Sequence, residues 1–429
     1  MTVGASPPPL GSPATRPAIL RALAGRIRSL RAAPLLSPVA MGERWVEWNG
    51  RHPVSPDHGP HLAAAVDWLA RAQEATPDDG FSRGYGLTWD SYFGARGWQP
   101  SYPETTGYII PTLYQAARHL NRADLAERAT RAARWELAIQ LPSGAVRGGV
   151  IGQESSPAVF NTGQVMFGWL AALHETGSSL FADAARRAAT FLVESLDHDG
   201  LWRRGNSRFA ASGSTLYNTR TAWALAEAGT RLEAREFTSA AARNLTAVAR
   251  RCLANGWVPD CCLDDAAHPL LHTIAYALRG LLEGGRVLED TRLIDRAAVA
   301  AEHIATTVRS DGSLPGRYTA SWSPAAEWSC LTGNAQMANV WLRLTEITGD
   351  RSWLEPVAAV VPFVKSTQNR TSHDSGLRGG IKGSFPMHGG YGRYQVLSWA
   401  VKFFVDALIR DERVRTGAPT KGDEPIVLS

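Results

Sequence analysis

Five short segments of the chain place a polar residue beside a threonine where an apolar, helix-period stretch begins. The threonines are Thr106, Thr162, Thr219, Thr273 and Thr332. By subtraction of residue numbers they lie 56, 57, 54 and 59 residues apart, a step that fits a repeat of two helices and two connections. The polar residues beside them are Glu104, Asn161, Asn218, His272 and Asn334. Carboxylate, amide and imidazole groups at one repeated position are typical of a binding or catalytic cleft, and we predict that these side chains face one.

The first chemistry that these residue types support is removal of the C5 proton of a uronate sugar. Such a reaction needs an amide or guanidinium group for the sugar carboxylate, a base for the proton and a phenol as an acid. Elimination would make the protein a lyase, and return of the proton to the opposite face would make it an epimerase. Two tyrosines lie one helical turn after a polar head residue. The candidate catalytic residues are Glu104, Tyr108, Asn161, Asn218, Arg220, His272 and Tyr276.

The second chemistry is hydrolysis of a glycosidic bond by two carboxylates. Glu104 is then the expected acid, and its partner would be Asp90, Glu154 or Glu327. The sequence does not set the distance between these carboxylates, so the hydrolase stays open beside the lyase and the epimerase.

Two further alternatives use the same fold. A terpenoid-type cyclase would need an Asp-x-Asp-Asp acid motif, and the nearest match, within 260–265, has no acid at the first required position. A toroid without catalytic residues would bind a glycan as an accessory protein.

Helix-period stretches come in pairs between residues 59 and 412. They span 61–73 and 104–120, 123–140 and 161–175, 180–196 and 218–232, 237–253 and 272–282, 292–308 and 332–347, and 353–368 and 395–410. The first member of each pair is amphipathic and charged, whereas the second is apolar on nearly every side. A helix without a polar face must be buried all round. We therefore predict an all-α protein, a single (α/α)6 toroid of six hairpins and twelve helices, whose second members form an inner ring.

The inner helices of such a toroid run in the same direction, so their N-termini open on one face together with the long connections. The helix N-termini and the arginines of these connections would favour an anionic group. The expected partner is a polysaccharide or a lipid-linked oligosaccharide, and no cofactor or metal is expected. The residues predicted to bind the substrate are Trp89, Asp90, Arg147, Gln164, Arg317, Trp322, Asn334, Lys382 and Tyr391.

The two ends of the chain differ from the toroid. Residues 1–58 are predicted to be an extension with a disordered start that is rich in Pro, Ser and Gly. Residues 16–33 have the pattern of a basic amphipathic helix, which would pack on the outside of the domain or dock on an anionic membrane surface. Residues 413–429 are predicted to be a flexible tail.

The net charge of +5 and the pI of about 9.1 permit an acidic partner but do not demand nucleic acid. No arginine-rich groove with interleaved aromatic residues indicates nucleic-acid binding. There is no stretch of 18 apolar residues that would predict a membrane span, and the N-terminus lacks the apolar core of a signal peptide. We expect a cytoplasmic protein. The alternative is a cytoplasmic protein that contacts the inner membrane peripherally through residues 16–33. The sequence does not set the oligomeric state.

Cys252, Cys261 and Cys262 lie close together in the sequence, and Cys330 is remote. Four cysteines in a chain of 429 residues do not make a disulfide framework. We expect reduced, buried thiols, because a zinc site would need better-spaced ligands, with His272 as the nearest addition.

With these residues in view, the chain resembles the VpsJ-type toroids, a bacterial family found with exopolysaccharide and O-antigen genes. The segments that carry the resemblance are 160–165, 217–220, 272–276, 330–336 and 380–384. The resemblance implies an (α/α)6 toroid that takes part in polysaccharide biosynthesis. More distantly, the architecture is similar to glucuronyl C5-epimerases, to toroidal uronate lyases and to terpenoid-cyclase-like toroids. The first two use Asn, His, Tyr and Arg in the roles given above.

Overall fold

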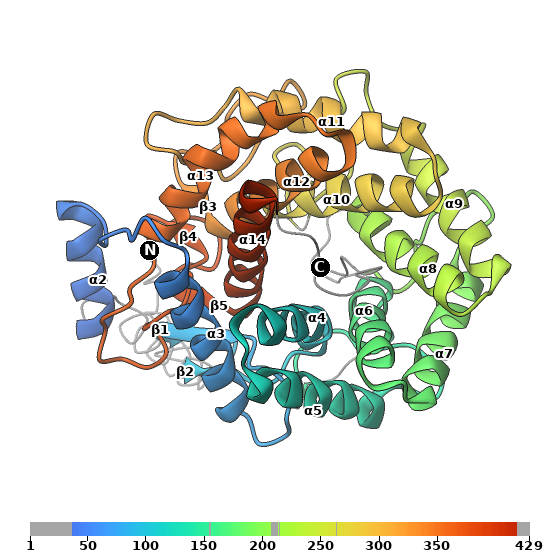
Figure 1. Cartoon of the computed structure of the whole chain (residues 1–429), viewed down its shortest axis with the longest axis horizontal. Coiled ribbons are helices and arrows are strands. Elements are labelled where there is room, and N and C mark those ends of the chain that lie inside the picture. The colour runs from blue at the N-terminus through green and yellow to red at the C-terminus, as the bar shows by residue number, and fades with distance from the viewer. Residues whose placement is uncertain (1–36, 154–155, 207–212, 214, 263, 418–429) are drawn as a thin grey trace, which may run out of the picture.

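The computed structural model describes residues 37–153, 156–206, 213, 215–262 and 264–417. Six inner helices form a closed ring, and six outer helices surround it (Figure 1). The inner helices are α4 (Pro103–Leu120), α6 (Val159–Thr176), α8 (Thr219–Arg231), α10 (Leu271–Val287), α12 (Leu331–Thr348) and α14 (Ser398–Thr416). The outer helices are α3 (Gly59–Glu74), α5 (Ala123–Ile139), α7 (Ser179–Ser195), α9 (Arg235–Ala249), α11 (Thr291–Ala305) and α13 (Leu354–Ser366). The predicted (α/α)6 toroid is thereby confirmed.

Each inner helix packs most closely against the outer helix that follows it, rather than against the one that precedes it. The connections from inner to outer helix are short, which keeps the two helices together as an antiparallel hairpin. The last inner helix, α14, packs against both α3 and α4 and so closes the ring. The predicted pairs consist of an outer helix and the inner helix that follows it across a long connection. The closely packed hairpins instead consist of an inner helix and the outer helix that follows it.

The inner helices are buried all round, as their apolar composition predicts. Every residue of α6 from Val159 to Ala172 is buried. Gly107 of α4 allows the next inner helix to approach closely, because a Cβ atom there would lie 2.4 Å from the Cα of Val165 on α6. Glycine near the start of this helix therefore serves helix packing.

The repeated threonine fastens the incoming connection to the first turn of the inner helix. The hydroxyl of Thr162 accepts a hydrogen bond from the backbone N–H of Val146 (2.9 Å) and donates one to the carbonyl of Ala158 (2.7 Å). Thr106 accepts in the same way from the N–H of Phe81, at 2.9 Å. In these two repeats the hydroxyl thus holds the connection after the glycine turn against the helix, whereas the hydroxyl of Thr219 donates to the carbonyl of Ala277 on α10 (3.0 Å).

In the fifth repeat this task passes to Asn334, whose Oδ1 accepts from the N–H of Leu314 (3.0 Å). Among the residues that the structure describes, none of the six inner helices has a side-chain hydrogen bond at its N-cap. The motif is therefore not the helix cap that its residue types would favour. The N-termini of the inner helices keep their partial positive charge toward the face of the long connections.

Short strands occur in the long connections, which an all-α prediction did not include. Strands β2 (Ala95–Trp98), β1 (Gly84–Asp90) and β5 (Gln395–Leu397) form an antiparallel sheet in that order. Strands β3 (Ser329–Cys330) and β4 (Ser384–Phe385) form a second pair. The first sheet joins the first and the last long connections, which lie side by side because the ring is closed.

A further helix, α2 (Pro38–Asn49), lies in the predicted N-terminal extension and was not expected there. Lys382, which was predicted to bind substrate, is buried against α2 and pairs with Glu43 and Glu47. Burial alone would raise the pKa of Glu43, but Lys382 and the His52 contact together outweigh it and lower that pKa to about 2. Lys382 therefore anchors α2. The helix predicted over 16–33 lies outside the described residues.

The last helix, α14, continues to Thr416, past the boundary predicted at residue 412. Arg413 in its last turn pairs with Glu346 of α12, which ties these residues to the ring. No helix in the described part of the chain is long and apolar enough to cross a bilayer.

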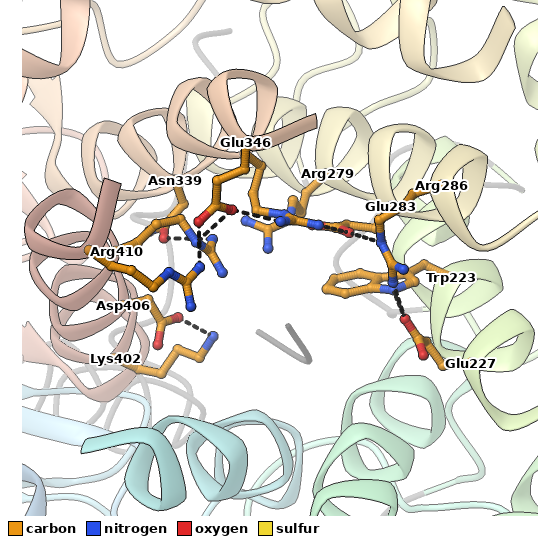
Figure 2. A network of polar contacts seen from close by, with 12 residues as sticks. Trp223, Glu227, Arg279, Glu283, Arg286, Asn339, Glu346, Lys402, Asp406 and Arg410 are labelled. Carbon is orange, nitrogen blue, oxygen red and sulfur yellow. Dashed lines mark hydrogen bonds and ion pairs between the residues drawn. The ribbon is translucent and has the colours of Figure 1, made fainter. Parts of the chain in front are cut away.

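Charged side chains of the inner helices form a connected network around the axis of the ring (Figure 2). Glu283 of α10 accepts hydrogen bonds from Arg279 and Arg286 of the same helix, both at 2.9 Å. Arg343 of α12 adds another at 2.7 Å and also pairs with Glu346 (2.6 Å). Burial alone would raise the pKa of Glu283, but the charges of Arg343 and Arg279 hold it well below its usual range. These polar contacts join α10 to α12 inside the ring.

Lys402 and Asp406 of α14 extend the polar contacts toward α4. The Lys402 ammonium donates to one oxygen of Asp406 (2.6 Å), and the other oxygen accepts from the hydroxyl of Thr112 on α4 (2.8 Å). The ring is therefore closed by buried polar pairs as well as by apolar packing.

Replacing Thr162 by valine keeps the shape of the side chain and leaves the buried N–H of Val146 without an acceptor. We expect the free energy of unfolding to fall by about 1–3 kcal/mol. Thr162→Ser keeps the hydroxyl and should lose clearly less. Urea denaturation followed by circular dichroism measures both variants. Equal losses would show that the hydroxyl does not hold the connection.

Candidate functional site

Glu104, in the first turn of α4, is a half-buried carboxylic acid on the face of the long connections. The phenol of Tyr102 donates a hydrogen bond to its Oε2. Burial raises the pKa of Glu104 to about 7, and the Tyr102 hydrogen bond and the charge of Arg83 offset only part of that rise. At neutral pH this carboxyl group is present in both protonation states, as a general acid or base requires.

Arg83 is held beside this acid by amide side chains. Its Nη1 donates to Oε1 of Gln99 (2.7 Å) and to Oε1 of Gln395 (3.0 Å). Its guanidinium lies 4.9 Å from the centre of the Trp399 ring. Gln395 in turn donates to Asp90 (2.6 Å). The sheet of β1 and β5 therefore fixes a cation where the ring opens.

Aromatic side chains form the wall and floor below Glu104. The phenols of Tyr108 and Tyr276 lie 3.4 Å apart and are buried. The ring of Phe160 packs against Tyr276 (5.0 Å between centroids) and against Tyr217 (5.1 Å). Burial raises the pKa of Tyr276, and the charge of Glu104 raises it further. Both phenols are therefore protonated at neutral pH, and the hydroxyl of Tyr276 donates to that of Tyr108.

Arg220 lies beneath these tyrosines and is 1% exposed. Its guanidinium is 5.2 Å from the centre of the Tyr276 ring and 5.9 Å from that of Tyr108. Its Nε donates to Oε1 of Gln164 (2.7 Å), which orients the group. Its Nη2 has no hydrogen-bond partner among the described residues. Arg220 therefore offers a buried, positioned donor to the floor of the site.

His272 completes the group from α10. Its Nδ1 is 2.8 Å from Oε1 of Gln336, so Nδ1 carries the proton and Nε2 is the basic nitrogen. Its ring lies 4.4 Å from that of Tyr276 and 5.5 Å from that of Tyr391. Burial lowers the pKa of His272 to about 4, although the Gln336 contact opposes this. The imidazole is therefore neutral at neutral pH.

The structure thus brings five of the predicted catalytic residues into one cluster. They are Glu104, Tyr108, Arg220, His272 and Tyr276. Two of the predicted substrate-binding residues join them, Gln164 through Arg220 and Tyr391 through its ring contact with His272.

The two predicted catalytic asparagines hold connections in place. Asn161 donates from Nδ2 to the carbonyl of Arg147 (3.0 Å), and Asn218 donates to Asn206 (3.0 Å) and Thr215 (3.1 Å). The Oδ1 of Asn218 is buried and has no partner among the described residues. Within the described residues, this amide oxygen is therefore buried and unsatisfied.

Several predicted substrate-binding residues make structural contacts away from the cluster. Trp322 is 4% exposed, and its indole N–H donates to the carbonyl of Asn255 (2.9 Å). Arg317 pairs with Asp264 (2.8 Å). Lys382 holds α2, and Asn334 holds the connection before α12, as described above. The polar groups of these four side chains are therefore used in contacts within the protein rather than held free for a ligand.

Arg147, Trp89 and Asp90 also lie in the long connections. Arg147 donates to the carbonyl of Gln153, and Trp89 is half-buried on β1. Asp90 accepts from Gln395 through one oxygen and from the backbone N–H of Tyr92 (2.8 Å) through the other. Of the other carboxylates predicted as partners of Glu104, Glu327 is exposed and Glu154 lies outside the described residues.

The candidate cyclase and metal motifs lie elsewhere. Asp264 is exposed and pairs with Arg317, and the half-buried Asp265 pairs with His268 (3.0 Å), so the two do not form a buried acid. The four cysteines carry free thiols. Within the described ranges, no group of three or more His, Cys, Asp or Glu side chains is arranged to hold a metal ion.

Four members of the site were not predicted from the sequence: Arg83, Tyr102, Trp399 and Lys402. Tyr102 directly precedes the first motif, where an aromatic residue also stands before Asn161 and Asn218, so this signal was present. Lys402 lies one turn before Asp406 on α14 and is fully buried. Burial lowers its pKa to about 7, against the opposing charge of Asp406.

No protein-family profile and no curated protein sequence matches the chain. An unsaturated glucuronyl hydrolase described as specific for heparin matches its fold with a TM-score of 0.65 at 16% identity, over 83% of this chain and 97% of the other. A D-mannose isomerase matches with 0.62 at 12% identity, over 83% and 97%. The cellobiose 2-epimerase of Bacillus thermoamylovorans matches with 0.60 at 11% identity, over 86% and 98%. At identities this low, the structural matches show a shared toroid fold and nothing further.

The raised pKa of Glu104 makes the stability of the protein depend on pH. Below pH 4.5 the Glu104 carboxyl is neutral in both the folded and the unfolded chain. As the pH rises above 4.5, this carboxyl ionises in the unfolded chain before it ionises in the folded protein. The free energy of unfolding therefore falls as the pH rises from 4.5 to about 7 and then levels off. Glu104→Gln lacks this loss, so relative to the wild type it should gain up to about 3 kcal/mol between pH 4 and pH 8.

Urea denaturation at the two pH values measures this gain. Glu327→Gln, which removes an exposed carboxylate, is the matched control and should follow the wild type at both values. A stability difference between Glu104→Gln and the wild type that stays constant with pH would contradict the raised pKa.

Proposed function

We propose that this protein is a carbohydrate-active enzyme that moves a proton on the sugar ring of an acidic glycan, with Glu104 as its acid and base. The observation that carries the proposal is the half-buried Glu104 carboxyl, whose pKa is raised to about 7 and which lies beside the phenol of Tyr102 and near the guanidinium groups of Arg83 and Arg220. Aromatic faces suit sugar rings. The fold neighbours support the substrate class, because their names describe a glucuronyl hydrolase, a mannose isomerase and a cellobiose epimerase.

We assign roles in a lyase or C5-epimerase reaction to Glu104, to the phenols of Tyr108 and Tyr276, and to the two arginines Arg83 and Arg220. Arg83 and Arg220 would neutralise the uronate carboxylate, which makes the C5 proton more acidic. The Glu104 carboxylate would take that proton, and the electron pair would move into the carboxylate as an enolate. In a lyase, the bond from C4 to its oxygen then breaks, and a phenol of Tyr108 or Tyr276 protonates the leaving oxygen. In an epimerase, a proton returns to C5 from the opposite face.

Hydrolysis is the second candidate, because Asp90 is linked to the opening through Gln395 and Arg83. Both oxygens of Asp90 already accept hydrogen bonds, so it is less free than a catalytic base or nucleophile should be. Glu104 has no second unengaged carboxylate in the cluster among the described residues. The geometry therefore favours proton transfer by a single acid over a pair of carboxylates.

The cellular role that we propose is bacterial polysaccharide biosynthesis or processing in the cytoplasm, without a cofactor. The resemblance to the VpsJ-type toroids supports it. The substrate would be an exopolysaccharide or O-antigen polymer, or its lipid-linked precursor. An accessory protein that only binds the glycan is the outcome if the chemistry is absent.

Purified protein incubated with uronate polymers tests the proposal. A lyase produces an unsaturated product that absorbs ultraviolet light, and an epimerase incorporates deuterium from heavy water without that absorbance. We expect one of the two signals, and a loss of about 10²–10⁴-fold in kcat for Glu104→Gln. Glu327→Gln should keep the wild-type rate.

New reducing ends without either signal would support the hydrolase and contradict proton transfer at C5. If all three assays stay silent and the protein still binds the glycan, the enzyme assignment fails and the binding module stands.

A further inference from the structure

The helix α2 carries its large apolar side chains on the outside of the protein. Met41, Trp45 and Trp48 are 45%, 64% and 89% exposed. They are spaced by four and three residues, so they share one face of the helix. Tryptophan is rarely left this open on a soluble surface, and a continuous apolar stripe marks a place of interaction.

The opposite face of α2 carries its acids. Glu43 and Glu47 point inward, where Lys382 pairs with both and His52 contacts Glu43 (2.8 Å). The amphipathic pattern of this helix is therefore reversed, with charges inside and tryptophans outside. Because buried ion pairs hold the helix, the orientation of the tryptophan stripe is fixed by the fold.

The charge of the chain is concentrated just before this helix. Residues 1–42 contain five arginines and no acidic residue, and the net charge of the whole chain is +5. The remainder of the chain is therefore neutral overall. The arginines are Arg16, Arg21, Arg26, Arg28 and Arg31. Arg44 adds an exposed cation to α2 itself, so the cationic part of the chain runs directly into the tryptophan stripe.

We propose that the exposed face of α2, formed by Met41, Trp45 and Trp48, docks on an anionic lipid bilayer. Tryptophan favours the boundary between the headgroups and the acyl chains, and arginine is attracted to anionic headgroups. Stable attachment without a membrane span takes two such signals, an apolar one and a basic one. A nucleic acid would use the arginines but would leave the apolar stripe unexplained.

The position of α2 suits such contact. It lies at the outer edge of the ring, apart from the axis, and beside β1 (Figure 1). The hydroxyl of Ser37, just before α2, donates to the carbonyl of Leu87 on β1 (2.6 Å), which ties the helix to the sheet at the opening. Docking through α2 would therefore hold the toroid at its rim. This inference is independent of the reaction proposed above.

Vesicle sedimentation with the full chain tests the proposal. Vesicles of phosphatidylcholine with about a third phosphatidylglycerol should bind the wild type and shift its tryptophan emission to the blue, whereas pure phosphatidylcholine should bind it much less. The double variant Trp45→Ala, Trp48→Ala should lose at least about tenfold in partition coefficient. Its side chains are exposed, so its thermal unfolding should match the wild type.

The matched control is the double variant Leu180→Ala, Leu253→Ala, which removes two exposed apolar side chains from elsewhere on the surface (63% and 49% exposed). It should bind like the wild type. Absence of binding to anionic vesicles, or equal binding by the two double variants, overturns the proposal. So does protection of Trp45 and Trp48 from an aqueous quencher without vesicles, since another part of the protein would then cover the stripe.

Discussion

The closed inner ring is the constraint on which the rest of this structure depends. Six packed inner helices surround the axis, so a polar side chain that is buried inside the ring must be satisfied by its neighbours. Glu283 is satisfied by Arg279, Arg286 and Arg343 (Figure 2). Such buried pairs are weak evidence for added stability, but removing one partner is costly. They therefore restrict which residues can line the axis.

The candidate site lies where this pairing becomes incomplete. At the opening, Glu104 has a phenol as its partner in place of an arginine, and its pKa rises to about 7. Below it, Arg220 has an amide and aromatic rings around it but no carboxylate within hydrogen-bond distance among the described residues. In the described part of the chain, Glu104 is therefore an acid without a hydrogen-bonded cationic partner, and Arg220 is a cation without an anionic one. An acidic substrate would supply the missing anion for Arg220.

Much of this arrangement could be predicted from the sequence, because the apolar period and the repeated motif are local signals. They identified the twelve helices and placed Glu104, His272 and Tyr276 on one face. The sequence could not show that Lys382 pairs with Glu43, since 339 residues separate them. It also did not reveal α2, whose amphipathic pattern is reversed, or the short strands that bring Arg83 to the opening. The repeated motif identified the positions, and only long-range contacts decided which of them hold a connection and which face the site.

The pKa of Glu104 tests the central claim most directly. Carbon NMR of protein labelled at the glutamate side-chain carboxyl, assigned by the signal that disappears in Glu104→Gln, follows this one group as the pH is changed. The account predicts a midpoint near pH 7, because burial outweighs the Tyr102 hydrogen bond and the charge of Arg83. A midpoint near 4.5 would show an ordinary surface carboxylate and would contradict the assignment of Glu104 as the acid and base of the site.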